Sequence, residues 1–182
     1  MLEAALDLIA ESGVRSVTKR AVCSRARLND RYFYEHFSDI NALLLALGEW
    51  VTTQGLQAVL DATRGSAPPA RVHAAAGAAL GFLLADPRRA QLLISSHTTE
   101  TLQSIRIATN HQIAASMSAL TREQLGPKAP PTCDTDLVSF TIISGTMELV
   151  AAWLRGEFDT DRDHLTDIIA AMLFAAGHIS RK

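Results

Sequence analysis

The spacing of the apolar residues restricts the fold of this chain more than any other feature, because they recur every three or four positions along most of its length. That spacing places apolar side chains on one face of an α-helix, whereas a half-buried strand would alternate them at every second residue. The Asn-Gly and Asp-Gly pairs that favour tight β-hairpins do not occur. The sequence therefore predicts an all-α protein.

Glycine, proline and capping residues divide this pattern into nine expected helices. Thr18 and Asn29 are expected to cap the second and third helices, and Asp39 and Asp86 the fourth and sixth. The expected helices span about residues 2–12, 19–26, 30–36, 40–62, 70–85, 87–94 and 98–125, followed by one from 134 or 135 to 155 and one from 160 or 161 to 178. We expect three parts: a small domain over residues 1–38, a connecting helix over 39–62, and a larger helical domain over 63–182.

Length and composition exclude several classes of protein. The chain has 182 residues, of which 48% are hydrophobic and 20% are charged, so disorder is not expected. No apolar run reaches the roughly 18 residues of a membrane helix, and Glu3, Asp7 and Glu11 lie where a secretory signal would be basic and apolar. Cys23 and Cys133 are far apart, which supports neither a disulfide nor a zinc site. We expect a cytoplasmic protein without membrane contact.

Positive charge is concentrated in one short segment of a chain whose formal net charge is −2. Residues 13–36 hold six basic and two acidic side chains, a net charge of +4, and residues 1–12 hold three acids and no base. A basic segment in a mildly acidic protein fits a nucleic-acid footprint, although a solvated basic surface gives the same pattern.

The same segment predicts a helix-turn-helix, because two short helices separated by a tight turn fall between residues 18 and 37. In this unit the second helix enters the major groove of DNA while caps and flanking side chains hold phosphates. Thr18 and the free amides after it suit a phosphate, and Arg31 on the first turn of the second helix can bind guanine with two hydrogen bonds. Phe33, Phe37, Val22 and Ala26 are expected to form the core of this small domain.

The segment LNDRYFYEHF at residues 28–37, followed by SDINALLLAL, resembles the helix-turn-helix of the tetracycline-repressor (TetR) family of bacterial transcription regulators. EAALDLIAESGVRSVT resembles the first-helix entry of that family. The resemblance implies a helix-turn-helix domain of three helices followed by a ligand-binding and dimerisation domain of six. It also implies caps at Thr18 and Asn29, phosphate contacts by Tyr34 and His36, and base-reading positions at Arg31 and Tyr32. With the charged and turn residues beside them, the predicted DNA-binding set is Thr18, Lys19, Arg20, Arg27, Leu28, Asn29, Asp30, Arg31, Tyr32, Tyr34 and His36.

Three departures from the family pattern bear on DNA affinity. Arg27 stands where the family commonly has a turn glycine, and it would be strained if its φ were positive. Ile40 replaces the usual lysine at the start of the fourth helix, so one phosphate anchor is missing. The basic arm that commonly precedes the first helix is also not part of this sequence.

The C-terminal half has more apolar side chains than a tight bundle needs, which indicates a cavity for a small molecule. Isolated polar groups on its apolar faces are of the kind that orients a ligand, although a buried histidine is equally well explained as core. The residues predicted to line the cavity are Phe82, His97, Thr109, His111, Met117, Phe140, Thr141, Ser144 and Met147.

The last two helices carry apolar residues on more than one face, which indicates a partner. The family resemblance makes that partner a second copy of the chain, and two-fold symmetry then predicts a palindromic operator. The predicted interface residues are Leu149, Ala152, Trp153, Leu165, Ile168, Ile169, Met172 and Leu173.

Together these features predict a homodimeric repressor that binds double-stranded operator DNA and is released by a small, largely apolar effector. No phosphate loop, His-Glu-x-x-His motif or nucleophile elbow occurs, so we expect no enzyme, no cofactor and no metal. The alternative is an all-α small-molecule-binding protein whose DNA binding is weakened or lost.

Overall fold

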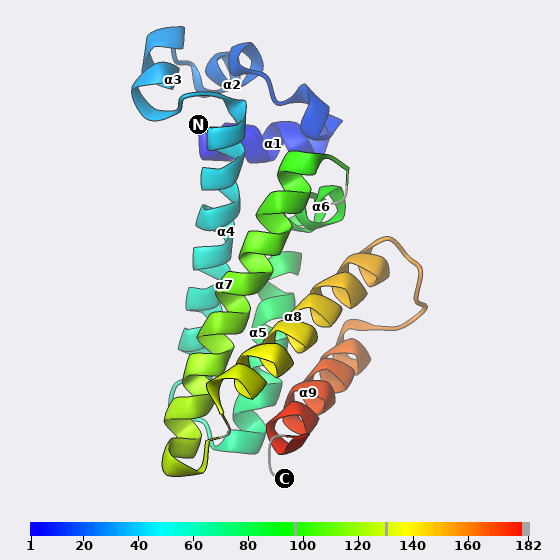
Figure 1. Cartoon of the computed structure of the whole chain (residues 1–182). Coiled ribbons are helices and arrows are strands. Elements are labelled where there is room, and N and C mark those ends of the chain that lie inside the picture. Colours follow the sequence, from blue (N-terminus) through cyan, green and yellow to red (C-terminus); the bar gives the residue numbers. More distant parts are fainter. Residues whose placement is uncertain (97, 130, 180–182) are drawn as a thin grey trace. The chain divides into compact units, whose positions relative to one another are not determined.

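The computed structural model describes residues 1–96, 98–129 and 131–179, and within them it contains nine α-helices and no strand, which confirms the all-α prediction (Figure 1). The helices are α1 (Leu2–Ser12), α2 (Lys19–Ala26), α3 (Asp30–His36), α4 (Ile40–Thr63), α5 (Pro68–Leu84), α6 (Pro87–Ser95), α7 (Glu100–Leu125), α8 (Thr132–Leu154) and α9 (Arg162–Ile179). Two short 3₁₀ helices, η1 (Val14–Ser16) and η2 (Gly126–Lys128), were not predicted.

The predicted caps explain where several helices begin. The Thr18 hydroxyl accepts a hydrogen bond from the Ala21 amide at 3.2 Å, and the Asn29 side chain accepts one from the Tyr32 amide at 3.3 Å. Asp39 and Asp86 cap α4 and α6 in the same way. Each bond satisfies an amide that the first turn of a helix leaves without an internal partner.

Two helices begin earlier than predicted. α5 begins at Pro68 rather than at residue 70, because the first turn of a helix needs no amide donor and therefore accepts proline. α8 begins at Thr132 rather than at residue 134 or 135, directly after Pro131, whose extended backbone stands at the N-cap position. α7 begins at Glu100, slightly later than the predicted residue 98.

The chain forms two compact units. The N-terminal unit comprises residues 1–54 and 83–107, and the C-terminal unit comprises residues 55–82 and 108–182. Two long helices, α4 and α7, contribute residues to both units.

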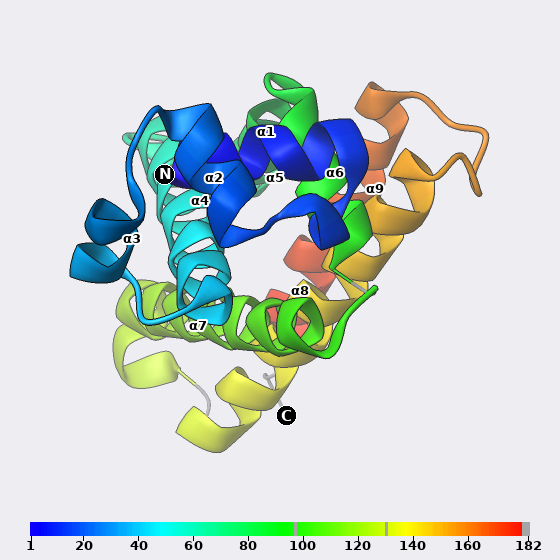
Figure 2. The same ribbon diagram turned by 90° about the horizontal axis from the view of Figure 1, so that it is seen from above.

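The N-terminal unit is built around a continuous apolar core. Phe33 of α3 is 1% exposed and lies in one cluster with residues of α1, α2, α4 and α7. The predicted core residues Phe33 and Val22 are confirmed, whereas Phe37 and Ala26 are only partly buried against the cluster. Cys23 is buried beside them. α1 lies beside α6, as Figure 2 also shows. The buried members of the cluster are Ala4, Ala5, Leu6, Ile9, Val17, Val22, Cys23, Phe33, Leu43, Leu44, Leu47, Leu102 and Ile105.

The interior of the C-terminal unit is different in kind, because small and polar side chains make up most of it. Its described buried apolar residues include four alanines beside Leu80, Ile143, Val150, Leu165 and Ile169. Six of the eight buried polar side chains in the described chain also lie in this unit. They are Asn110, Ser118, Thr135, Ser139, Thr146 and Thr166.

α8 and α9 lie side by side within the C-terminal unit (Figure 1). By length and composition α8 could cross a membrane, since its mean hydropathy is 1.6 over the tested window, of which 33% is buried in the structure. Core helices of soluble proteins pass the same test, so this finding alone assigns no membrane contact.

Candidate functional site

The turn between α2 and α3 sets the geometry of the helix-turn-helix. Arg27 ends α2 with φ 55° and ψ 41°, the left-handed conformation, and it is the only non-glycine residue with positive φ that the structure describes. The Leu28 amide donates to the Cys23 carbonyl at 2.9 Å and the Arg27 amide to the Ser24 carbonyl at 3.2 Å. These bonds close the end of α2. The backbone of Arg27 is therefore strained, and its charged side chain is exposed close to the start of α3.

Replacing Arg27 with glycine is expected to raise the free energy of unfolding of the N-terminal unit by about 0.5–1 kcal/mol, because glycine adopts positive φ without strain. The same change should lower affinity for duplex DNA and reduce its salt dependence, because one cation is lost. Urea unfolding and fluorescence anisotropy measure the two effects. Arg27→Asn keeps a residue that tolerates this conformation and separates strain from charge. Equal stability of Arg27→Gly and the parent would contradict the strain argument.

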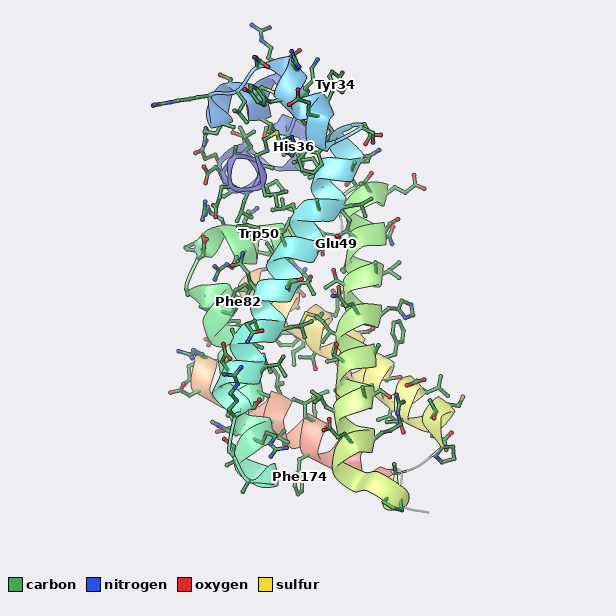
Figure 3. The ribbon with its side chains drawn as sticks, turned by 90° about the vertical axis from the view of Figure 1, so that its left-hand side faces the viewer. Tyr34, His36, Glu49, Trp50, Phe82 and Phe174 are labelled. Carbon is green, nitrogen blue, oxygen red and sulfur yellow. The ribbon has the colours of Figure 1, made fainter. Side chains whose placement is uncertain are left out.

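α3 presents one buried face and one exposed face. Phe33 lies in the core, whereas the Arg31 side chain is 85% exposed and Tyr32 and Tyr34 are 48% and 61% exposed. Figure 3 shows Tyr34 and His36 on this element. Tyr34 is therefore largely exposed, although its ring lies edge to face with that of Phe33, with ring centres 5.7 Å apart. The polar side chains on the exposed face of such a helix are accessible to a DNA duplex.

Ion pairs hold several of these exposed side chains in place. Lys19 Nζ lies 2.6 Å from Asp30 Oδ2 and 4.9 Å from the centre of the Tyr34 ring. The hydrogen bond that Lys19 donates to Asp30 raises the pKa of Lys19. Arg31 Nε donates to Glu35 Oε1 at 2.9 Å one turn along α3. The pairs orient the cations, and they also place two acidic groups on the surface that would face DNA.

Arg25, one of the six basic side chains of residues 13–36, joins a network with the acidic residues of α1. Its guanidinium donates to both Glu11 carboxylate oxygens, at 2.8 and 2.5 Å, and lies 3.6 Å from Asp7. Its hydrogen bond lowers the pKa of Glu11. Asp7 also accepts from Arg88 of α6 at 2.5 Å. The spacing of the α1 acids, four residues apart, was a signal that sequence analysis did not use.

Arg88 connects α6 to α1 within the N-terminal unit. Its guanidinium binds Asp86, the cap of its own helix, and reaches Glu3 at 2.8 Å. Hydrogen bonds, that to Asp86 first and then those to Asp7 and Glu3, hold the pKa of Arg88 well above its ordinary value. Its bond in turn lowers the pKa of Asp86. These contacts fix the end of α6 against the first helix.

The predicted ligand residues lie mainly on α7 and α8, but the structure does not gather them around one described cavity. His111 and Phe140 stack with ring centres 4.5 Å apart, and His111 and Thr141 are exposed. Phe82 lies against Gly55 of α4 and is labelled in Figure 3. His97 lies outside the described residues. The remaining members, Thr109, Met117, Ser144 and Met147, are half-buried.

The described pocket of the C-terminal unit is an open depression of about 370 Å³ that contains none of the predicted ligand residues. It lies where α4 ends, and the hydrogen bonds from Arg71 to the Ser66 carbonyl order its rim. Its lining residues are Leu60, Thr63, Arg64, Gly65, Arg71 and Leu120.

The structure corrects part of the predicted dimer interface. Ala152, Leu165 and Ile169 are 6%, 2% and 3% exposed within a single chain, so they form the core of the unit and leave almost no surface for a partner. Trp153 is also engaged internally, because its Nε1 donates to the Thr160 carbonyl at 2.8 Å. Ile168 is 43% exposed, as an interface residue should be. The other predicted members, Leu149, Met172 and Leu173, are half-buried.

Comparison with known families agrees with the helix-turn-helix geometry. Residues 1–47 match the sequence model of the family described as bacterial regulatory proteins, tetR family. This segment therefore carries the helix-turn-helix of the TetR family, as the sequence resemblance predicted. Among curated protein sequences, none matches this chain.

Solved structures of similar fold extend over nearly the whole chain. The fatty acid degradation regulator FadR from Bacillus halodurans has a TM-score of 0.76 at 17% identity, covering 100% of this chain and 95% of its own. FadR from Bacillus subtilis, in complex with stearoyl-CoA, has the same TM-score and identity and covers 96% of each chain. A TetR-family regulator from Syntrophomonas wolfei has a TM-score of 0.80 at 12% identity, covering 97% and 92%. At these identities the likeness shows the fold.

Proposed function

We propose that the protein is a cytoplasmic, homodimeric repressor that binds a palindromic operator and is released by a small, largely apolar effector. The observation that carries this proposal is the capped helix-turn-helix with an outward-facing set of polar side chains on α3, supported by the family match over residues 1–47. Arg31 and Tyr32 would read bases, while Thr18, Lys19 and Tyr34 would hold phosphates. The Thr18 hydroxyl accepts the Ala21 amide, so its own hydrogen is available to a phosphate oxygen.

Duplexes selected from a randomised pool should converge on a palindrome, and binding to that duplex should weaken steeply as salt is added. The double variant Arg31→Ala, Tyr34→Ala should lose at least about tenfold in affinity, because it removes a base contact and a backbone contact. Fluorescence anisotropy with the selected duplex measures this. Arg64→Ala, which removes an exposed arginine of the C-terminal unit, is the matched control.

Selection that yields no consensus, from a chain that still forms dimers, would contradict the repressor proposal. That result would favour the alternative of a small-molecule-binding protein without operator binding. Catalysis has no support in the family or in the similar structures, which are regulators.

The C-terminal unit is proposed to bind the effector. The effector would release DNA because it binds more tightly to the form of the dimer in which the two helix-turn-helix units do not fit the operator. The similar regulator from Bacillus subtilis is bound to stearoyl-CoA, which makes that molecule the first effector to test. Added stearoyl-CoA should then lower operator affinity.

The proposed dimer interface uses the exposed apolar residues of α8 and α9 rather than the buried ones. Leu137, Ile168 and Phe174 are 62%, 43% and 47% exposed, and Figure 3 labels Phe174. A single soluble chain rarely leaves so many large apolar side chains exposed on neighbouring helices without a partner. A second copy would also account for the membrane-like composition of α8.

Ile168→Glu is expected to convert the dimer to a monomer at micromolar concentration, because it places a charge in an apolar interface without an opposite charge. Leu120→Glu, at a site on α7 that is 42% exposed, should leave the dimer intact. Sedimentation equilibrium measures both. A dimer of unchanged strength in Ile168→Glu would show that the interface lies elsewhere.

A further inference from the structure

The buried ring of Phe33 fixes which side of α3 faces away from the protein. A helix turns about 100° per residue, so the residues two positions before and two positions after Phe33 each lie about 160° from it around the helix. These residues are Arg31 and Glu35, and they occupy the outermost line of α3. Their side chains are 85% and 44% exposed. The face of α3 that would enter a groove of DNA is therefore centred on one arginine and one glutamate.

Arg31 and Glu35 bind each other through a single nitrogen of the guanidinium. Arg31 Nε donates to Glu35 Oε1 at 2.9 Å, one turn along the helix. Within the residues that the structure describes, Nη1 and Nη2 of Arg31 donate no hydrogen bond. Because the guanidinium is a rigid plane, a bond at Nε fixes the plane and leaves the two terminal nitrogens as a pair of donors. Two such donors match O6 and N7 of guanine in the major groove.

Helix stability does not explain the Arg31–Glu35 pair. Positive side chains stabilise the C-terminal end of a helix and negative ones the N-terminal end, because the backbone dipoles sum along the axis. In the seven residues of α3 this order is reversed, with Arg31 in the first turn and Glu35 in the last. Pairs in this order are also weaker than pairs in which the acidic residue comes first. The pair therefore needs an explanation other than support of the helix.

Glu35 by itself opposes DNA binding. A carboxylate at the centre of a DNA-facing surface repels the phosphates, which supply much of the affinity of such interfaces. A glutamate is favourable there when it accepts a hydrogen bond from cytosine or when it holds a neighbouring arginine. The 2.9 Å bond to Arg31 favours the second role. A long side chain loses rotamer freedom when it binds, and one that is already held loses less.

We propose that Glu35 is a positioning residue for base recognition, which holds Nε of Arg31 so that Nη1 and Nη2 bind one guanine in each half of the operator. This inference rests on the proposed operator binding, and it specifies one base of the operator and the residue that enforces it. Glu35 acts through Arg31 and touches no base. Sequence analysis selected Arg31 but not Glu35, although their spacing of four residues was visible.

The test measures base preference at each operator position with the full-length protein, by selection from randomised duplexes and by fluorescence anisotropy with single-base changes of the selected duplex. Arg31→Ala identifies the position that Arg31 reads, because a guanine preference of about tenfold or more should be lost there. Glu35→Ala should reduce the preference about fivefold at that same position and leave the other positions unchanged. In the Arg31→Ala background, Glu35→Ala should have no further effect on base preference, because the two residues act as one unit.

Glu35→Gln separates the positioning role from the charge. Its amide oxygen can still accept the hydrogen bond from Arg31 Nε, whereas the negative charge is gone. Both Glu35 variants should bind random duplexes more tightly than the parent, because repulsion of the phosphates falls. Only Glu35→Ala should lose guanine preference. Both should keep the Tm of the parent, since the site is exposed and alanine and glutamine favour helix.

Asp61→Ala is the matched control, because it removes an exposed carboxylate 3.0 Å from Arg64 in the C-terminal unit and should change neither base preference nor binding to random duplexes. A guanine preference that survives in Glu35→Ala would overturn the inference. So would its loss in both Glu35 variants, since charge rather than the Nε bond would then be the cause. A lost cytosine preference at a separate position would show that Glu35 reads a base itself, which also contradicts the inference.

Failure of this inference and failure of the proposed function give different results. Selection that yields no consensus rejects the repressor function together with the positioning role that rests on it. A clear consensus whose base preferences are the same in the parent and in Glu35→Ala rejects the positioning role alone.

Discussion

Replacing Phe33 with alanine is expected to lower the free energy of unfolding of the N-terminal unit by about 3–5 kcal/mol. Phe33 is 1% exposed, and its ring lies 5.7 Å from the ring of Tyr34 and 5.9 Å from that of Phe37. α3 has only seven residues, too few to be stable alone, so this side chain is what fixes the helix to the domain. Operator binding should be lost together with the fold.

Urea unfolding followed by circular dichroism measures the loss, and operator affinity measures its consequence. Tyr32→Ala removes an aromatic ring from the same helix at a site that is 48% exposed, and it should change stability by no more than about 0.5 kcal/mol. Phe33→Leu keeps most of the volume and should retain most of the stability. An unchanged urea midpoint in Phe33→Ala would show that α3 is held by something other than this core.

The parts of the structure that sequence analysis predicted correctly depend on interactions between near neighbours. Thr18 caps the Ala21 amide and Asn29 the Tyr32 amide, so cap and target lie three residues apart and both are visible in the sequence. The strained turn at Arg27 was recognised for the same reason, because the helices on either side fix its position. Local rules of this kind locate the helix-turn-helix without knowledge of the rest of the fold.

The parts that were missed depend on which face of a helix meets which neighbour. α9 has apolar residues on several faces, and periodicity alone does not tell that Leu165 and Ile169 face their own unit while Ile168 faces outward. Arg25 and Arg20 look alike in the sequence, although of these two only Arg25 contacts the acids of α1 in the described contacts. Asn110 is similarly one of several polar residues on α7. Packing between segments that are far apart in the sequence decides which face of a helix is buried and which charged residue is paired. A single sequence does not show that packing.

Gly48 is another residue whose role the sequence does not reveal, because nothing near it in the sequence explains a glycine in the middle of a long apolar helix. In the structure α4 meets α7 here, and a Cβ atom on Gly48 would overlap Ile105 Cγ2. Ile105 is 9% exposed and branched at Cβ, so it has little freedom to move aside. The absence of a side chain at Gly48 is therefore what allows the two helices to approach within the N-terminal unit.

Gly48→Ala is expected to destabilise the N-terminal unit by about 2–3 kcal/mol, even though alanine favours helix by about 1 kcal/mol over glycine. Gly77→Ala is the matched control: its Cβ would meet Thr166 at an ordinary 3.7 Å, so the change should be neutral or stabilising. The double variant Gly48→Ala, Ile105→Leu moves the branch from Cβ to Cγ and should recover part of the loss. Additive effects of the two substitutions would show that the steric contact is not the cause, because residues in contact must couple.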